Sequence, residues 1–310
     1  MTSRPHSRAD IVRGAAFVAL SAIAFGAMAI FGRYAYAGGA DVLGLLTLRF
    51  AIAGAVLTLI AARRGVVWPR VRAVWPIVGM GGIGYVGQSL CYFTALQHAE
   101  ASLVALLLYL YPAFVTLLAA WWLGERLTKV KVAALVLCVS GSAVMVGGGH
   151  GDSLGIALAL AAAVIYSLYI VIGARFTRSV DPLATSAIVC VSSALVLAVM
   201  CAARASSGAA PHVPATSAGW AAALAIALVS TVAALLCFFA GLERLGAART
   251  SMLSTLEPVV TVALAAITLG EALTPLQWAG GAAILAAVLW LVRAGGGAHD
   301  EEAVALEANQ

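Results

Sequence analysis

The stretch LGERLT at Leu123–Thr128 returns as LGEALT at Leu269–Thr274, 146 residues further along the chain. The similarity extends in front of both copies, so that residues 92–128 match residues 238–274. A repeat of this length indicates two halves of similar structure. In membrane carriers the transport path usually lies between two such halves.

The composition is that of a membrane protein. Hydrophobic residues make up 63% of the 310 positions and charged residues 10%, far from the composition of soluble domains. Apolar stretches of about 20 residues, each long enough to cross a bilayer as a helix, recur along the chain. They do not alternate in polarity as barrel strands would. We therefore expect an all-α integral membrane protein with ten transmembrane helices, at residues 14–35, 42–62, 74–94, 101–122, 131–147, 154–174, 182–202, 219–240, 249–269 and 275–294.

The distribution of positive charge predicts the orientation. If the N-terminus is cytoplasmic, the inner segments hold fifteen Lys and Arg residues, and the outer side holds only Arg33 and Arg204. This follows the positive-inside rule and places both termini in the cytoplasm. The net charge of +5 is then a topology signal, and no nucleic-acid partner is needed to explain it.

Each half holds five predicted spans. Because five is odd, the second half enters the membrane from the opposite side, and the halves form an inverted repeat of the kind that supports alternating access. The predicted organisation is a cytoplasmic tail, a first repeat, a connecting loop, a second repeat and an acidic cytoplasmic tail, at residues 1–13, 14–147, 148–153, 154–294 and 295–310.

Two five-span halves, each with a proline in its fourth span (Pro112 and Pro258) and an LGExLT motif at the end of that span, resemble the drug/metabolite transporter superfamily. Within it the chain is similar to the ten-helix bacterial metabolite exporters, some of which export amino acids, including aromatic ones. Arg49 in the second span also matches that family's first half, whereas Val189 stands at the matching place in the second half. The resemblance covers roughly residues 14–294 and implies export across a bacterial inner membrane.

Polar residues near the middle of the spans are the candidates for a substrate cavity, because leaving a polar group in hydrocarbon costs roughly 2–7 kcal/mol. A tyrosine usually lies at the membrane interface, yet five of them lie close to mid-span. Together they indicate an aromatic-lined chamber suited to a neutral or aromatic amino acid, although helix packing explains any single one equally well. The predicted substrate-binding residues are Phe25, Tyr85, Gln88, Tyr92, Tyr109, Tyr111, Tyr166, Tyr169, Ser230, Ser251, Ser254 and Glu257.

Glu257 is the only carboxylate near the middle of a span, and Arg49 is the only cation there. One interpretation is that Glu257 binds the substrate amine or a coupled proton. The other is structural: an ion pair with Arg49, or a protonated acid bonded to a helix backbone. We assign Arg49 a structural or gating role, together with Pro112 and Pro258, which should kink their spans and serve as hinges.

The sequence thus predicts a secondary transporter that exports neutral or aromatic amino acids and similar small metabolites by alternating access, working as a monomer among membrane lipids. The alternatives are a carrier of sugars, nucleotide sugars or lipophilic drugs, and an intramembrane enzyme acting on lipid phosphates. That enzyme would need clustered Glu, Arg, Ser or His at cavity depth, and the five histidines lie elsewhere. We expect no catalysis, metal or cofactor, because GMGGIG at residues 79–84 lies inside an apolar span and the cysteines lack C-x-x-C spacing.

Overall fold

The computed structural model describes residues 8–123, 128–148, 151–177, 180–245, 250 and 253–290, and these are helical apart from their connections. In chain order the helices are α1 (Arg8–Gly26), α2 (Met28–Ala37), α3 (Val42–Arg63), α4 (Val71–Gly79), η1 (Met80–Tyr85), α5 (Val86–His98), α6 (Ala101–Leu108), α7 (Tyr111–Leu123), α8 (Lys129–Gly148), α9 (Ser153–Phe176), α10 (Pro182–Ser206), α11 (Ser217–Ala227), η2 (Leu228–Ala233), α12 (Ala234–Leu245) and α14 (Leu256–Leu269). A further helix follows at Pro275–Trp290.

Within the described part of the chain, these helices fall into ten consecutive stretches, one for each predicted span. Seven stretches are long and apolar enough by themselves to cross a membrane, and the last two are shorter apolar helices. The remaining stretch, α4 to α5, is the glycine-rich third span. The prediction of an all-α protein with many membrane-spanning helices is confirmed.

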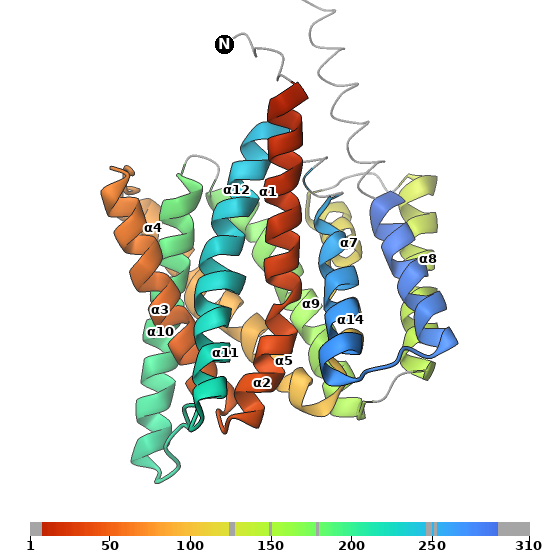
Figure 1. Ribbon diagram of the computed structural model, residues 1–310. Helices are drawn as coiled ribbons and strands as arrows, with labels where there is room; N and C mark the ends of the chain where they lie inside the picture. Colours follow the sequence, from red (N-terminus) through yellow and green to blue (C-terminus); the bar gives the residue numbers. More distant parts are fainter. Residues whose placement is uncertain are drawn as a thin grey trace, which may run out of the picture.

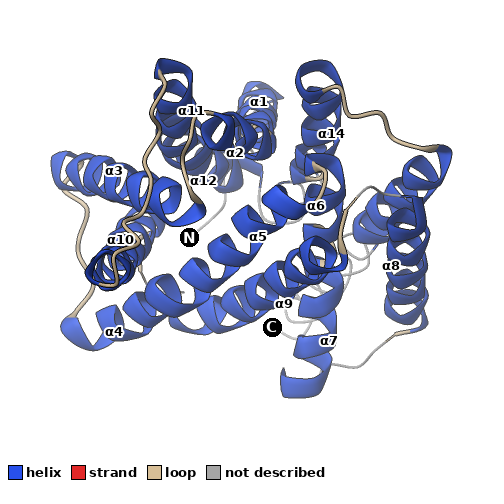
Figure 2. Ribbon diagram, turned by 90° about the horizontal axis from the view of Figure 1, so that it is seen from below, coloured by secondary structure: helices blue, strands red, loops and turns tan. Residues whose placement is uncertain are grey.

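The two halves pack as an inverted repeat (Figures 1 and 2). The first span of one half lies against the third span of the other, since α1 packs on α12 and α9 packs on α5. In the same way α1 packs on α14 and α9 on α7, while the second spans, α3 and α10, pack on each other. These exchanged contacts are the ones that a two-fold axis in the membrane plane produces.

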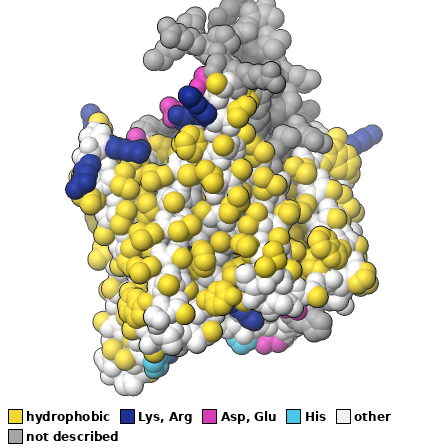
Figure 3. Space-filling view, in the orientation of Figure 1, with side chains coloured by type: hydrophobic (Ala, Val, Ile, Leu, Met, Phe, Trp, Pro, Cys, Tyr) yellow, Lys and Arg dark blue, Asp and Glu magenta, His cyan; other side chains and the backbone are white. Residues whose placement is uncertain are grey.

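The surface agrees with the predicted orientation (Figure 3). On the face shown, a broad hydrophobic band crosses the middle of the molecule, and Lys and Arg side chains gather along the rim where α1 begins. The opposite rim carries histidine and acidic side chains and less Lys and Arg. By the positive-inside rule the end where α1 begins is the cytoplasmic end, here called the inner end, and the other is the outer end.

Both third spans contain a π-helical turn at a matching place, η1 in the first half and η2 in the second. A π turn leaves a carbonyl without its usual helical partner, and side chains bond to such groups in both halves. The Ser193 hydroxyl donates to the Gly81 carbonyl at 2.9 Å, and the Thr231 hydroxyl donates to the Ile226 carbonyl at 2.9 Å.

The fourth and ninth spans are interrupted just before their prolines. A turn at Tyr109 and Leu110 separates α6 from α7, in which Pro112 is the second residue. Thr255 likewise forms a turn before α14, whose third residue is Pro258. Each proline therefore lies in the first turn of the following helix, where its missing N–H is tolerated, and the bend precedes it.

Glycine sets the close approach of η1 to α10. A Cβ atom at Gly81 would lie 2.6 Å from the carbonyl oxygen of Val189 and 2.1 Å from Oγ of Ser192, whereas a Cβ atom at Gly79 would meet nothing within 4 Å. Of these two positions, packing requires a glycine at Gly81 and not at Gly79.

We expect Gly81→Ala to lower the free energy of unfolding by about 1–3 kcal/mol, the usual effect of overpacking a tight contact. Gly79→Ala is the matched control and should leave stability unchanged or raise it by up to about 1 kcal/mol, since alanine favours a helix. Thermal unfolding in detergent, followed by tryptophan fluorescence, measures both. Equal melting temperatures for the two variants would contradict the assignment of Gly81 to this contact.

Candidate functional site

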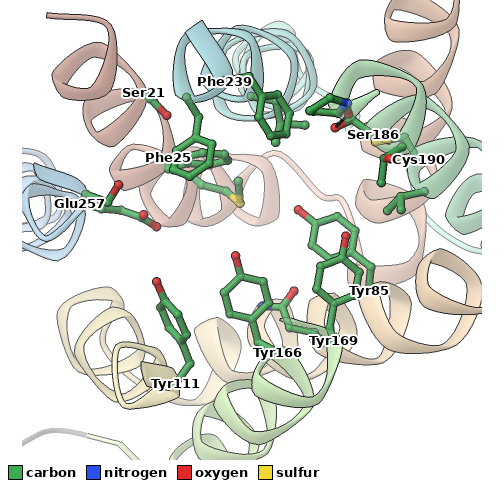
Figure 4. A pocket seen from close by; sticks show the side chains of 18 of the residues that line it. Ser21, Phe25, Tyr85, Tyr111, Tyr166, Tyr169, Ser186, Cys190, Phe239 and Glu257 are labelled. Atoms are coloured by element: carbon green, nitrogen blue, oxygen red, sulfur yellow. Dashed lines mark hydrogen bonds between the residues drawn. The ribbon is translucent and has the colours of Figure 1, made fainter. Parts of the chain in front are cut away.

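A cavity of about 390 Å³ lies between the two halves (Figure 4). Its walls come from α1, α2, α3, η1, α5, α6, α7, α9, α10, α12 and α14, together with the turns beside them. The cavity also reaches Thr177 and Val180, between α9 and α10, and Pro182, the first residue of α10, at the inner end. It therefore extends from the middle of the bundle toward the cytoplasmic side.

Five tyrosines form one continuous wall of this cavity. Neighbouring ring centroids lie 5.5 Å apart for Tyr85 and Tyr169, 6.0 Å for Tyr169 and Tyr166, 4.9 Å for Tyr166 and Tyr111, and 5.7 Å for Tyr111 and Tyr109. Figure 4 shows hydroxyl groups of this row directed into the cavity, with Phe25 and Phe239 on the other side. The wall offers both aromatic surface and hydroxyl groups to a ligand.

Arg49 lies at the Tyr85 end of the row and is only 2% exposed. Its Nε donates to the Thr231 hydroxyl at 3.1 Å, and its Nη2 donates to the Tyr85 hydroxyl at 3.3 Å. The guanidinium carbon is 4.8 Å from the ring centroid of Phe50 and 5.5 Å from that of Phe93, which adds cation–π attraction. Arg49 thus links α3 to the π turns of both halves.

Glu257 lies at the other end of the row, next to Tyr109. Its carboxylate is 3.4 Å from the Tyr109 hydroxyl, which also donates to the Ser254 carbonyl. Among the residues that the structure describes, no cation contacts Glu257 and no carboxylate contacts Arg49. The ion pair between them, one of the structural alternatives, is therefore not formed in this conformation.

The structure brings ten of the twelve predicted substrate-binding residues into the lining of this one cavity, and Arg49 lines it as well: Phe25, Tyr85, Gln88, Tyr92, Tyr109, Tyr111, Tyr166, Tyr169, Ser254 and Glu257. Ser230 is fully buried in η2 and does not belong to the lining, and Ser251 lies outside the described residues. Pro112 and Pro258 adjoin the cavity-lining turns without lining it themselves. That these residues bind substrate stays a prediction.

Sequence reasoning missed the side of the cavity that α10 and α12 supply. Phe238 and Phe239 line it, and they match Tyr92 and Phe93 in the repeat. Applying the repeat to the predicted Tyr92 would have identified Phe238. Ser186 and Cys190 also line the cavity, but small residues in an apolar span carry no comparable signal.

The outer end is closed by a contact between the halves. The Glu271 carboxylate, from the second LGE motif, accepts the backbone N–H groups of Ala101 at 2.9 Å and Ser102 at 3.0 Å, and the Ser102 hydroxyl at 2.7 Å. It thereby caps the N-terminus of α6, where unpaired N–H groups and the helix dipole favour an anion. The motif glutamate of one half holds a helix of the other.

Two further side-chain contacts strengthen the same end. Arg204 of the second half lies 3.0 Å from Asp41 of the first, and His98 at the end of α5 lies 2.8 Å from Asp152, which precedes α9. The N–H of Gly155, which donates to Asp152 at 2.7 Å, and the neighbouring His98 hold the pKa of that carboxyl below its usual value. With the outer end joined in this way, the cavity is directed toward the inner end.

Comparison with known proteins supplies the context. The sequence profile described as the EamA-like transporter family matches residues 12–147 and again residues 153–293. The aromatic amino acid exporter YddG of Ancylobacter novellus is 36% identical over 141 residues, which are 43% of this chain and 49% of that protein. A probable terminal-alkyne amino-acid exporter of Streptantibioticus cattleyicolor is 29% identical over 82% of this chain and 85% of its own. A solved crystal structure superposes with a TM-score of 0.64 and 26% identity, covering 89% of this chain and 95% of the other.

The Glu271 cap leads to a test of the closed outer end. Losing such a cap destabilises the closed outer end by about 0.5–2 kcal/mol. Glu271→Ala should therefore raise the fraction of molecules that are open to the outside by about 2- to 30-fold. The measurement is the rate at which a membrane-impermeant maleimide, added to intact cells, labels a single cysteine at cavity position 239 (Phe239→Cys, with the five native cysteines replaced by alanine). Glu243→Ala, which removes an exposed carboxylate at the inner end, is the control and should not change the rate. If Glu271→Ala labels no faster than its parent, the cap does not close the outer end.

Proposed function

Because the chain belongs to the EamA-like transporter family and is a multi-pass protein of the inner membrane, we propose that it is a secondary carrier that exports neutral or aromatic amino acids by alternating access. The observation that carries this proposal is the cavity between the halves, with its five-tyrosine wall and one basic and one acidic side chain. Its volume of about 390 Å³ falls in the range of small-molecule sites.

The chemistry of the lining suits an amino acid. Aromatic faces of Tyr111, Tyr166 and Tyr169 on one side and Phe25 and Phe239 on the other provide stacking surface for an aromatic or apolar side chain. Hydroxyl groups satisfy polar atoms of the substrate inside the membrane. A lipophilic drug would not interact favourably with a buried basic and a buried acidic side chain. A zwitterionic substrate could interact with both of them.

The relatives support the same substrate class. Two of them are named as amino acid exporters, one for aromatic amino acids and one for terminal-alkyne amino acids. The first alignment spans only about half of that relative, so its substrate enters here as support for a proposal. We propose further that one chain suffices, because both halves of the cavity come from it, and that the chain transports without catalysing a reaction.

Alternating access follows from the inverted halves. In the described conformation the outer end is held by Glu271, Arg204 and His98, and the cavity reaches the inner end. Opening outward would require these contacts to break while the halves rock about the cavity. We propose that the helix breaks before Pro112 and Pro258, which lie beside the cavity, serve as the hinges.

Purified protein in liposomes tests the substrate class. We expect saturable uptake and counterflow for tryptophan, phenylalanine, threonine and alanine, strongest for the two aromatic ones because the wall offers stacking surface. A labelled sugar and a nucleotide sugar complete the panel and should not move. Movement of the sugars alone, or of no compound in the panel, would overturn the proposed substrate.

Glu257→Gln tests an ionic role for this acid. We expect the variant to weaken the apparent affinity for phenylalanine by roughly 10- to 100-fold, as for the loss of a charged hydrogen bond of about 1.5–3 kcal/mol, and to flatten the dependence of transport on pH. Glu243→Gln, at the exposed inner end, should change neither property. An unchanged affinity and pH profile in Glu257→Gln would rule out substrate-amine binding and proton coupling at this site.

A further inference from the structure

Arg49 has more hydrogen-bond donors than its described partners use. A guanidinium carries five N–H donors, and among the residues that the structure describes only Thr231 and Tyr85 accept from it, the first from Nε and the second from Nη2. The side chain is 2% exposed and lines the cavity. Its remaining donors are therefore withheld from bulk water and lie beside the space that a substrate would occupy.

No carboxylate of the described part of the chain contacts Arg49 to compensate its charge. Arginine stays protonated in proteins, and among the described residues its partners are two hydroxyl groups and the aromatic faces of Phe50, Tyr85 and Phe93. Hydroxyl and cation–π contacts offset part of the cost of burying a cation, but they supply no negative charge. A cation held in this way at mid-membrane favours the binding of an anionic group from a ligand.

The position of Arg49 distinguishes it from Glu257. The tyrosine wall runs from Tyr85, which contacts Arg49, to Tyr109, which contacts Glu257, so the two charges lie at opposite ends of the row. An anionic group is attracted to the Arg49 end, whereas the acidic Glu257 end offers it no cation. The cavity therefore has a defined polarity for a ligand that carries a carboxylate.

We propose that Arg49 binds the carboxylate of the transported amino acid and makes a carboxylate a requirement for recognition. The inference rests on the proposed function and adds the residue that selects the substrate class. A planar guanidinium fork matches the two oxygens of a carboxylate. The neighbouring tyrosine rings then receive the substrate side chain. Amines and esters that share the side chain but lack the carboxylate are excluded.

The test is equilibrium binding to the full-length protein in detergent, measured by isothermal titration calorimetry. Three ligands share one aromatic ring: phenylalanine, phenethylamine, which lacks the carboxylate, and phenylalanine methyl ester. We expect wild type to bind phenylalanine about 10- to 100-fold more tightly than either analogue, because a charged hydrogen bond is lost with the carboxylate. In Arg49→Gln this ratio should fall to about 1- to 3-fold, and Arg49→Lys should give an intermediate ratio because lysine keeps the charge without the fork.

The matched control separates binding from support of the fold. Thr231→Val removes the hydroxyl that holds Nε of Arg49 but leaves the guanidinium in place. If Arg49 only links the helices, Arg49→Gln and Thr231→Val weaken all three ligands by the same factor and the wild-type ratio persists, which overturns the proposal. If Arg49 binds the carboxylate, Thr231→Val keeps the ratio and Arg49→Gln loses it.

The outcomes also distinguish this inference from the proposed function. If wild type binds and transports phenylalanine but binds phenethylamine equally well, the protein is still an amino acid carrier. The proposed role of Arg49 is then wrong. Wild type that binds none of the three ligands overturns the inference and the aromatic part of the proposed function. Since the wild-type ratio alone can refute the inference, the test does not depend on Arg49→Gln being stable.

Discussion

The arrangement depends on one constraint: a backbone carbonyl exposed inside a membrane must find a hydrogen bond. Five of the spans around the cavity are broken or form π turns, and polar side chains bond to carbonyls at these places. Ser167 of α9 donates to the Tyr111 carbonyl at the break in the fourth span, and Thr261 of α14 donates to the Gly26 carbonyl at the break in the first. Ser193 donates to the Gly81 carbonyl in η1, and Thr231 of η2 donates to the Ile226 carbonyl in the same span, just before that π turn. Most of these bonds join one half of the protein to the other.

The same constraint explains where the cavity lies. An irregular backbone is tolerated in a membrane only where protein or a water-filled space surrounds it, so the breaks gather at the interface of the halves. Residues at the breaks then line the cavity between the two halves. Tyr85, for example, ends η1, and Tyr109 forms the turn before α7. Arg49 contacts both π turns and lines the cavity. The breaks and π turns of the helices therefore lie in the same part of the molecule as the candidate binding groups.

The sequence predicted the helices and most of the cavity because both depend on patterns that a single chain displays. Apolar length predicted the spans, and mid-span polarity predicted the tyrosine wall. It could not predict that Arg49 and Glu257 stay apart, since this depends on which face of each helix meets the cavity. Nor could it predict that Glu271 caps α6 of the other half. Contacts between distant segments of this kind leave no periodic signal.

The Glu271 cap has a consequence for the evolution of this protein by gene duplication. The N-terminus of α6 obtains its carboxylate cap from the other half, and the carbonyl of Gly81, which accepts the N–H of Val86, obtains a further donor from α10. A single five-helix unit would lose both of these stabilising contacts. Before the duplication, an ancestral half would therefore have needed a second copy inserted in the opposite orientation. Fusion into one chain fixed the two orientations and allowed each half to diverge, so that an arginine could be kept at position 49 while valine occupies position 189.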